Sequence, residues 1–293
     1  AYPIVHTHTP PATPPVIALS YGDTMSFGVP ENPQNWIQIP GRVTDDNGVA
    51  TLSYSVNGGA SQAAPLGPNG TRLVGSGDFN IELDRADLAA GANTVELTAT
   101  DINGADATTT VTVNLTAGQV WPLPHTADWG SASSVTDAAD VVDGLWELTA
   151  DGVRTVETGY DRLLVLGDRA WTPGHEVIVP MTVHSAQGGA GVGFAVGWQG
   201  HTGTVAPRTG WPLEAIGWVR NPAGSAQLRI LTYDSGIVGQ QALPGFAVGT
   251  TYILKARTEA LGTGDSRFQL KIWEEGDAEP AAWALEADVN SRD

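Results

Sequence analysis

Aromatic and hydrogen-bonding side chains are concentrated between residues 190 and 233 of this chain. Flat aromatic rings suit the C–H faces of sugars, while Arg, Gln and His donate to hydroxyl groups in a largely preformed cleft. This stretch therefore predicts a carbohydrate-binding site. Its candidate residues are Trp211, Arg208, Arg229, Tyr233, Gln227, Gln199, His201 and Arg220.

Alternation along the expected strands separates the three tryptophans of this stretch. Trp198 and Trp218 each share a strand face with large apolar residues, so both are expected in a core. Trp211 lies in a loop rich in Gly and Pro, and it is the better candidate for an exposed platform. The polar wall of the site would come from one face of the following strand, with Gln227, Arg229 and Tyr233.

Small residues occupy one face of the strand expected at 191–199. They are Gly191, Gly193, Ala195 and Gly197. Glycine inside a strand often marks a close approach by a ligand or by another backbone. Two interpretations remain open: a shallow sugar groove floored by small residues, or a bent strand whose glycines relieve crowding.

The chain lacks the usual motifs for cleaving polysaccharides. A glycoside hydrolase needs two carboxylates, about 5–5.5 Å apart for retention or roughly 6.5–9.5 Å apart for inversion. Glu274 and Glu275 are adjacent, so they point to opposite faces or occupy a turn. A lyase would need His and Tyr beside Arg, and the spacing of His184, His201 and Tyr233 matches no such motif. We therefore expect a protein that binds without catalysis.

Acidic turns in the first half offer the oxygen ligands that calcium prefers. The candidate ligands are Asp45, Asp46, Asn47, Asp101 and Asn103. The same residue types also occur in ordinary turns, because their side chains bond the backbone two residues on. A calcium site and plain turns therefore both remain open.

The composition restricts the class of partner. The 293 residues suggest two domains, and 36 Gly with 19 Pro suit short strands joined by many turns. A net charge of -18 argues against nucleic acid or an anionic membrane as partner. The absence of Cys excludes disulfides and thiolate metal sites, and no stretch approaches the roughly 20 apolar residues of a membrane span.

The first half shows the period-two alternation of short strands, with Asn-Gly type turns between them. Strands are expected at 36–39, 51–56, 79–83, 94–100 and 109–115, with a one-turn helix at 84–88. Residues 41–49, 54–59 and 88–104 resemble a bacterial immunoglobulin-like domain. That resemblance implies a β-sandwich that acts as a spacer or an adhesive module.

The second half alternates over longer segments, each with one apolar and one polar face, which predicts two antiparallel sheets packed face to face. Strands are expected near 145–149, 153–158, 162–166, 176–184, 191–199, 213–220, 226–233, 251–258 and 268–273. Residues 143–148, 159–163, 252–259 and 268–283 resemble the concanavalin A-like lectin/glucanase superfamily. The resemblance implies a jelly roll with a carbohydrate partner. Three alternatives are open for a final strand after 268–273: it is missing, disordered or supplied by a neighbouring molecule.

Together these observations predict an all-β protein of two antiparallel β-sandwiches. We expect a Pro/Thr-rich linker at 1–14, an immunoglobulin-like domain at 15–117 and a concanavalin A-like jelly-roll domain at 118–293. The predicted function is non-catalytic, lectin-like binding of a polysaccharide or glycan by a secreted or bacterial cell-surface protein. Two alternatives stay open: a structural or adhesive protein that self-associates or binds other surface proteins, and an accessory region of a polysaccharide lyase or glycoside hydrolase.

Overall fold

The computed structural model is all-β, as the alternation of the sequence predicts. It describes residues 13–28, 35–116, 123–160, 162–167, 174–185, 189–198, 200–211, 213–233, 235–262 and 264–290. Most of the expected linker at 1–14 therefore lies outside the described residues. The chain forms two compact units, and their boundary differs from the one expected at 117/118. Unit 1 comprises residues 1–168 and 201–210, and unit 2 comprises residues 169–200 and 211–293.

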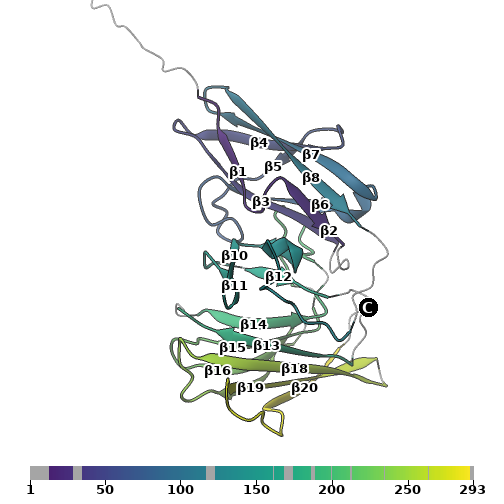
Figure 1. Ribbon diagram of the computed structural model, residues 1–293, viewed down its shortest axis with the longest axis vertical. Coiled ribbons are helices and arrows are strands. Elements are labelled where there is room, and N and C mark those ends of the chain that lie inside the picture. Colours follow the sequence, from purple (N-terminus) through teal and green to yellow (C-terminus); the bar gives the residue numbers. More distant parts are fainter. Residues whose placement is uncertain are drawn as a thin grey trace, which may run out of the picture. The chain divides into compact units, whose positions relative to one another are not determined.

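Unit 1 contains a sandwich of two sheets with an apolar core between them (Figure 1). One sheet has the order β1-β3-β6, with β1 (Val16–Leu19), β3 (Trp36–Thr44) and β6 (Asp78–Asp84). The other has the order β2-β8-β7-β4-β5, with β2 (Thr24–Phe27), β4 (Val49–Val56), β5 (Gln62–Ala64), β7 (Gly91–Asp101) and β8 (Asp106–Leu115). Neighbouring strands are antiparallel except for β2 and β8, which run parallel.

The core of this sandwich lies on the face that the alternation predicts. On β7 the side chains of Val95, Leu97 and Ala99 are completely buried, while the residues between them face outward. The expected one-turn helix is the 3-10 turn η1 (Arg85–Asp87). The carboxylate of Asp84 accepts a hydrogen bond from the backbone N–H of Ala86 at 2.8 Å, which satisfies one of the free donors at the start of the turn.

Residues 123–167 belong to unit 1, although the sequence pattern placed them with the second sandwich. They form the 3-10 turn η2 (Val135–Asp137) and two small antiparallel pairs, β9 (Asp140–Asp143) with β12 (Leu163–Val165) and β10 (Trp146–Thr149) with β11 (Gly152–Thr155). The Tyr21 hydroxyl, between β1 and β2, donates to the Gly144 carbonyl at 2.9 Å and accepts from the Trp146 N–H at 2.8 Å. These bonds tie the segment to the first sandwich.

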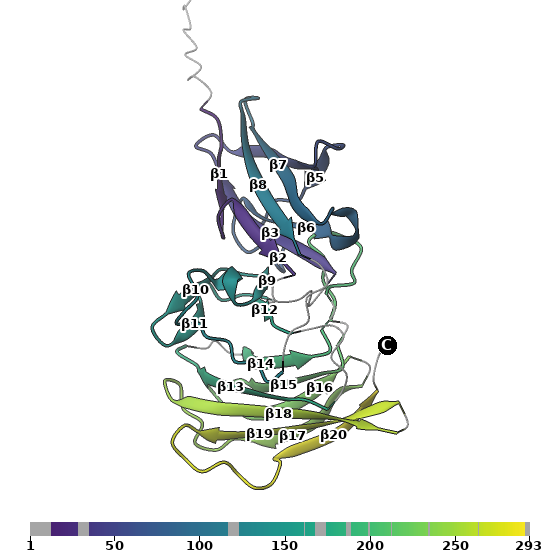
Figure 2. The ribbon, with the colours of Figure 1, turned by 45° about the vertical axis from the view of Figure 1, so that its right-hand side comes forward.

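Unit 2 is a sandwich of two four-stranded antiparallel sheets (Figure 2). The first, β13-β18-β19-β20, consists of β13 (Glu176–Thr182), β18 (Thr251–Leu261), β19 (Asp265–Glu274) and β20 (Leu285–Asn290). The second, β14-β15-β16-β17, consists of β14 (Gly191–Val196), β15 (Ala215–Arg220), β16 (Gln227–Thr232) and β17 (Gly236–Ala242). Strand β20 pairs with β19 from Asp265 to Leu270, so a strand does follow the one expected at 268–273.

Two short 3-10 turns are the only helical elements among the described residues. This part of the chain contains no helix that is long and apolar enough to cross a bilayer.

Candidate functional site

The sheet β14-β15-β16-β17 has an apolar inner side and a mixed outer side, which we call the outer face. Side chains alternate between the two sides along each strand. The inner side contributes Val196, Ala215, Val219, Leu228 and Ile230 to the core. The outer face consists of Gly191, Gly193, Ala195, Ile216, Trp218, Arg220, Gln227, Arg229, Leu231, Ile237, Gln240 and Ala242, which pair with one another in register.

Trp218 lies on the outer face, so the expectation that it packs in the core is wrong. Its neighbour Gly217 faces inward, where a Cβ atom would come within 2.8 Å of the Leu270 side chain. Because β15 is closely packed at Gly217, the large side chain at the next position must point away from the core. The indole is half-buried there.

The glycines of β14 make room for this indole. A Cβ atom at Gly191 would lie 2.5 Å from Cε3 of Trp218, and one at Gly193 would lie 2.1 Å from the Gly217 carbonyl oxygen. The space above Gly191 is therefore filled by the six-membered ring of Trp218. At Gly191 and Gly193 the small residues therefore relieve crowding, which is one of the two interpretations of this strand face. They do not form the floor of an open sugar groove, which is the other.

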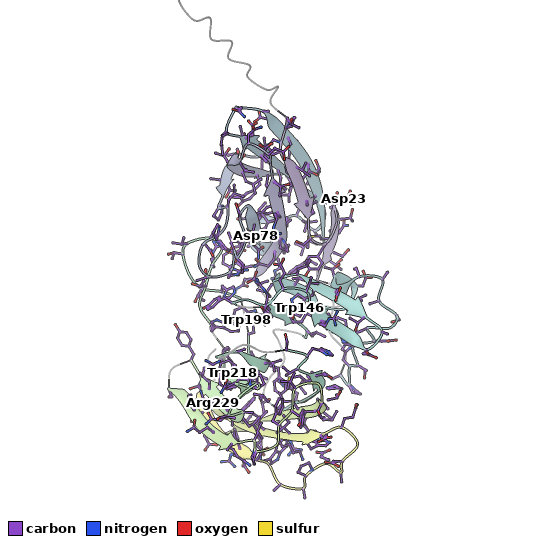
Figure 3. The ribbon with its side chains drawn as sticks, turned by 90° about the vertical axis from the view of Figure 1, so that its left-hand side faces the viewer. Asp23, Asp78, Trp146, Trp198, Trp218 and Arg229 are labelled. Atoms are coloured by element: carbon purple, nitrogen blue, oxygen red, sulfur yellow. The ribbon has the colours of Figure 1, made fainter. Side chains whose placement is uncertain are left out.

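Arg220, Gln227 and Arg229 surround Trp218 on the outer face. In the sheet register Trp218 is directly opposite Arg229, and Arg220 is directly opposite Gln227. Figure 3 labels Trp218 and Arg229 beside each other. The Arg229 Nε donates to the Gln227 side-chain oxygen at 3.0 Å, and the Arg220 guanidinium donates to the Ala190 carbonyl at 2.8 Å. The Arg220 guanidinium carbon lies 5.5 Å from the centre of the Trp218 ring.

The outer face carries no negative charge. None of the residues of β14, β15, β16 and β17 is Asp or Glu, although the chain has 32 acidic residues. The described contacts of Arg220 and Arg229 are to neutral acceptors, and no described carboxylate pairs with either. This face can stack and donate hydrogen bonds, but its described residues offer no carboxylate to serve as acid or nucleophile.

The outer side of the other sheet of unit 2 is covered by the loop between β19 and β20. Lys271 donates to the Pro280 carbonyl at 2.8 Å and pairs with Glu279 at 2.7 Å, and its ammonium lies 4.6 Å from the Trp283 ring centre. Lys255 also pairs with Glu279, at 3.0 Å. The cations of this sheet are thus already matched by carboxylates and an aromatic ring of the same chain, and they are less available to a ligand.

Trp211 and Tyr233 lie at the opposite end of the sheet from Arg220 and Gln227. The strands β14 and β15 pair from Gly191 opposite Arg220 to Val196 opposite Ala215, and Trp211 comes before Ala215 in the chain. The Trp211 ring packs against that of Trp198, with centroids 5.1 Å apart and planes tilted by 55°. Tyr233 follows the last residue of β16 and is 50% exposed. These two candidates therefore do not join the group around Trp218.

Two further candidates, His201 and Arg208, belong to unit 1. The Arg208 guanidinium lies 3.7 Å from the Trp36 ring centre and pairs with Glu82 at 3.1 Å. His201 is almost completely buried, and its Nδ1 is 2.7 Å from the Gly210 carbonyl oxygen. The Arg208 side chain and the bond from the Trp36 indole N–H to the His201 carbonyl, 2.8 Å, tie residues 201–210 to β3 and β6, while the His201 side chain closes the segment on itself. The candidate Gln199 lies outside the described residues.

Arg72 is the centre of this buried polar cluster. Its side chain is fully buried, pairs with Glu82, and donates to the Val142 carbonyl at 2.9 Å and to the Arg208 carbonyl at 2.7 Å. Asp143 lies 3.5 Å from Arg72. Burial raises the pKa of Asp143 to about 6, although Arg72 and Arg162 oppose the shift. Burial, reinforced by the positive charge of Arg72, lowers the pKa of His201 to about 4.

The candidate calcium ligands lie on two turns that the structure brings side by side. The N–H of Ile102 donates to the Gly48 carbonyl at 3.0 Å, which joins the two turns. Asp45 accepts from the backbone N–H of Asn47 at 2.7 Å, and Asp101 accepts from that of Asn103 at 2.8 Å. Both carboxylates thus stabilise their own turns. Asp46 lies on the first of these turns, and calcium there stays a prediction. Within the described ranges, no three His, Asp or Glu side chains gather closely enough to hold a metal ion.

Two members of the outer face escaped the analysis of the sequence. The strand face that Trp218 shares with Ile216 predicts a core position, because the inward contact of Gly217 cannot be seen in the sequence. Gln240 lies opposite Arg229 on β17 and is exposed, but β17 was not expected as a strand. The sequence does contain one indication that Trp218 faces outward, because Trp218 shares its strand face with the charged Arg220.

No family model and no curated protein matches this chain. Among solved structures, part of the chain is similar to the X-ray structure of the endo-beta-1,4-mannanase from Thermotoga petrophila, at 16% sequence identity and a TM-score of 0.27. The similarity covers 35% of this chain and 20% of that chain. A TM-score this low leaves the function to be argued from the residues of the chain itself.

Proposed function

We propose that this protein binds carbohydrate without cleaving it, through the outer face of sheet β14-β15-β16-β17. The observation that carries the proposal is the half-buried Trp218 indole, which packs on Gly191 and is bordered by Arg220, Gln227 and Arg229. An indole held rigidly on a sheet can stack on a sugar ring at little cost in side-chain entropy. The neighbouring donors suit hydroxyl groups.

The immunoglobulin-like and concanavalin A-like assignments are part of the same proposal. The sheets of unit 1 in the orders β1-β3-β6 and β2-β8-β7-β4-β5 support an immunoglobulin-like sandwich, in which seven or more strands form two sheets with Greek-key connections. The paired four-stranded sheets of unit 2 support a jelly-roll relative. We place the protein outside the cell or on a bacterial surface, where such modules meet polysaccharides.

The test is binding to a panel of neutral and acidic polysaccharides by affinity gel electrophoresis, with and without calcium. Trp218→Ala should weaken binding about fivefold or more, since a stacking contact of this kind contributes on the order of 1 kcal/mol or more. Trp218→Phe should keep most of the affinity. It retains a ring, and the Trp218 N–H has no hydrogen-bond partner among the described atoms.

The matched control is Trp283→Ala, which removes an aromatic ring that contacts Lys271 and Arg257 on the covered sheet. This variant should bind like the unmodified protein. Unchanged binding by a folded Trp218→Ala variant would remove the proposed site. Absence of any polysaccharide binding, together with sedimentation as long polymers, would favour the structural or adhesive alternative instead.

A further inference from the structure

We infer that the ligand of the outer face is an anionic polysaccharide, whose carboxylate or sulfate groups are bound by Arg229 with help from Arg220. This inference rests on the proposed function and names its substrate class. The chain as a whole carries a net charge of -18, so a face with two arginines and no acidic residue is a marked local exception.

The comparison of Arg229 with Arg257 shows what distinguishes this face. Both arginines lie in the middle of a sheet of unit 2 and point outward. Arg257 pairs with Glu176 at 3.1 Å and lies 5.7 Å from the Trp283 ring centre. The bonds of Arg229 are to the neutral side chain of Gln227. Its positive charge is thus left without a counter-charge from the described chain.

The geometry of the two guanidinium groups suits a charged sugar stacked on Trp218. Arg229 is directly opposite Trp218 and Arg220 is two residues along the same strand, so both flank the indole. Arg220 and Arg229 are diagonal neighbours on β15 and β16. Such neighbours are roughly 7–8 Å apart, within reach of long side chains. The planar guanidinium binds carboxylate and sulfate oxygens in a bidentate manner, which an ammonium group cannot do. Gln227 holds the Arg229 fork in place from one side.

The negative charge of the rest of the protein restricts which polyanions the outer face can bind. Surface charges farther away than a Debye length of about 8–10 Å are largely screened at physiological ionic strength, so the local arginines dominate close contacts. A polyanion that cannot place an acidic group beside Trp218 meets only the repulsion of the remaining surface. We therefore expect uronic acid or sulfated polymers to bind, and we expect a polyanion without sugar rings to bind poorly.

The experiment compares polygalacturonate with its fully methyl-esterified form, which has the same backbone without the charge. Dextran sulfate and dextran form a second pair that separates sulfate from carboxylate recognition, and inorganic polyphosphate tests attraction of any polyanion. The unmodified protein should bind at least one charged polymer at least about tenfold more tightly than its neutral partner. Arg229→Gln should abolish that difference, Arg229→Lys should restore part of it, and Arg257→Gln should leave it intact.

The outcomes separate the inference from the proposed function. Equal binding of charged and neutral partners that still depends on Trp218 would overturn the anionic ligand and retain carbohydrate binding. Polyphosphate bound as tightly as the charged polysaccharides would also overturn it, because sugar stacking would then contribute nothing. Binding of no polysaccharide would overturn both. Circular dichroism of each variant confirms that a loss reflects the site rather than the fold.

Discussion

The six-membered ring of Trp218 occupies the space that a side chain at Gly191 would need, with Cε3 only 2.5 Å from the position of a Cβ atom. This contact joins two strands through one aromatic residue and one glycine. The ring therefore lies directly over the β14 backbone, at a distance that only glycine permits.

Gly191→Ala should therefore destabilise unit 2 and displace Trp218. Overpacking of a close contact typically costs about 1–3 kcal/mol, and we expect a decrease of that size in the free energy of unfolding by urea. The affinity for polysaccharide should fall in parallel. The control is Gly239→Ala on β17, where the added methyl group would meet Ile230 at an ordinary 3.7 Å. Equal effects of the two substitutions would show that the contact with Trp218 does not matter.

Arg72→Leu should be among the most damaging single changes in unit 1. It would leave the fully buried Glu82 with only the partly exposed Arg208. It would also remove the Arg72 donor to the Arg208 carbonyl and one of the two donors to the Val142 carbonyl, which keeps the Asn80 amide. Breaking a buried ion pair from one side typically costs about 3–5 kcal/mol. Arg154→Leu removes an exposed pair with Glu147 and should cost about 1 kcal/mol or less. Chemical denaturation followed by circular dichroism measures both, and a similar cost for the two would contradict a central role for Arg72.

Alternation alone was enough to predict the sandwich cores. Val95 and Leu97 are buried where the period-two pattern placed them, because each strand of unit 1 has one face on the core. Residues 285–290 also alternate, so β20 was within reach of the same reasoning. Strand β17 was not, since its glycines at 236 and 239 and the irregular pairing beside Ile230 interrupt the pattern.

The candidate site depended on contacts between residues distant in the sequence. Arg208 was expected at the sugar site because it precedes Trp211 closely, yet its partner Glu82 is 126 positions away in the chain. Trp218 was expected inside because no local pattern reveals that Leu270 leaves space only for glycine at position 217. Spacing predicts which residues share a face of a strand. Which of the two faces points into the core depends on contacts with the opposite sheet, and these are not visible in the sequence.

Asp143 should make the protein less stable as the pH rises from about 4 to about 6. Its pKa in the folded protein, about 6, lies above the ordinary 3.8, because burial disfavours the charged form. Between these values the folded state binds more protons than the unfolded state, so the free energy of unfolding falls with increasing pH. Asp143→Asn keeps a neutral side chain of similar shape and should remove the contribution of Asp143, so the slope becomes less steep, while Asp140, whose pKa burial also raises, still contributes. A pH series of thermal unfolding curves tests it, and an unchanged slope in the variant would contradict the assignment.

The titration of His201 should change the stability of the protein in the opposite direction to that of Asp143, over an overlapping pH range. Its pKa in the folded protein is about 4, below the ordinary 6.5, because the buried ring is held neutral. The Gly210 carbonyl can only accept, so the neutral ring carries its proton on Nδ1 and donates across 2.7 Å. Stability from this group is present above pH 6.5 and is lost as the pH falls toward 4, by up to about 3 kcal/mol.

His201→Asn tests this because its side-chain N–H can replace Nδ1 without titrating in this range. The variant should be less stable than the unmodified protein at pH 7.5, since the imidazole packing is lost, and the difference should shrink toward pH 4. In the double variant with Asp143→Asn the contributions of both groups should be absent, and the pH dependence that remains should come from other groups such as Asp140, whose pKa burial also raises well above its usual range. A difference between His201→Asn and the unmodified protein that stays constant with pH would show that His201 contributes packing alone.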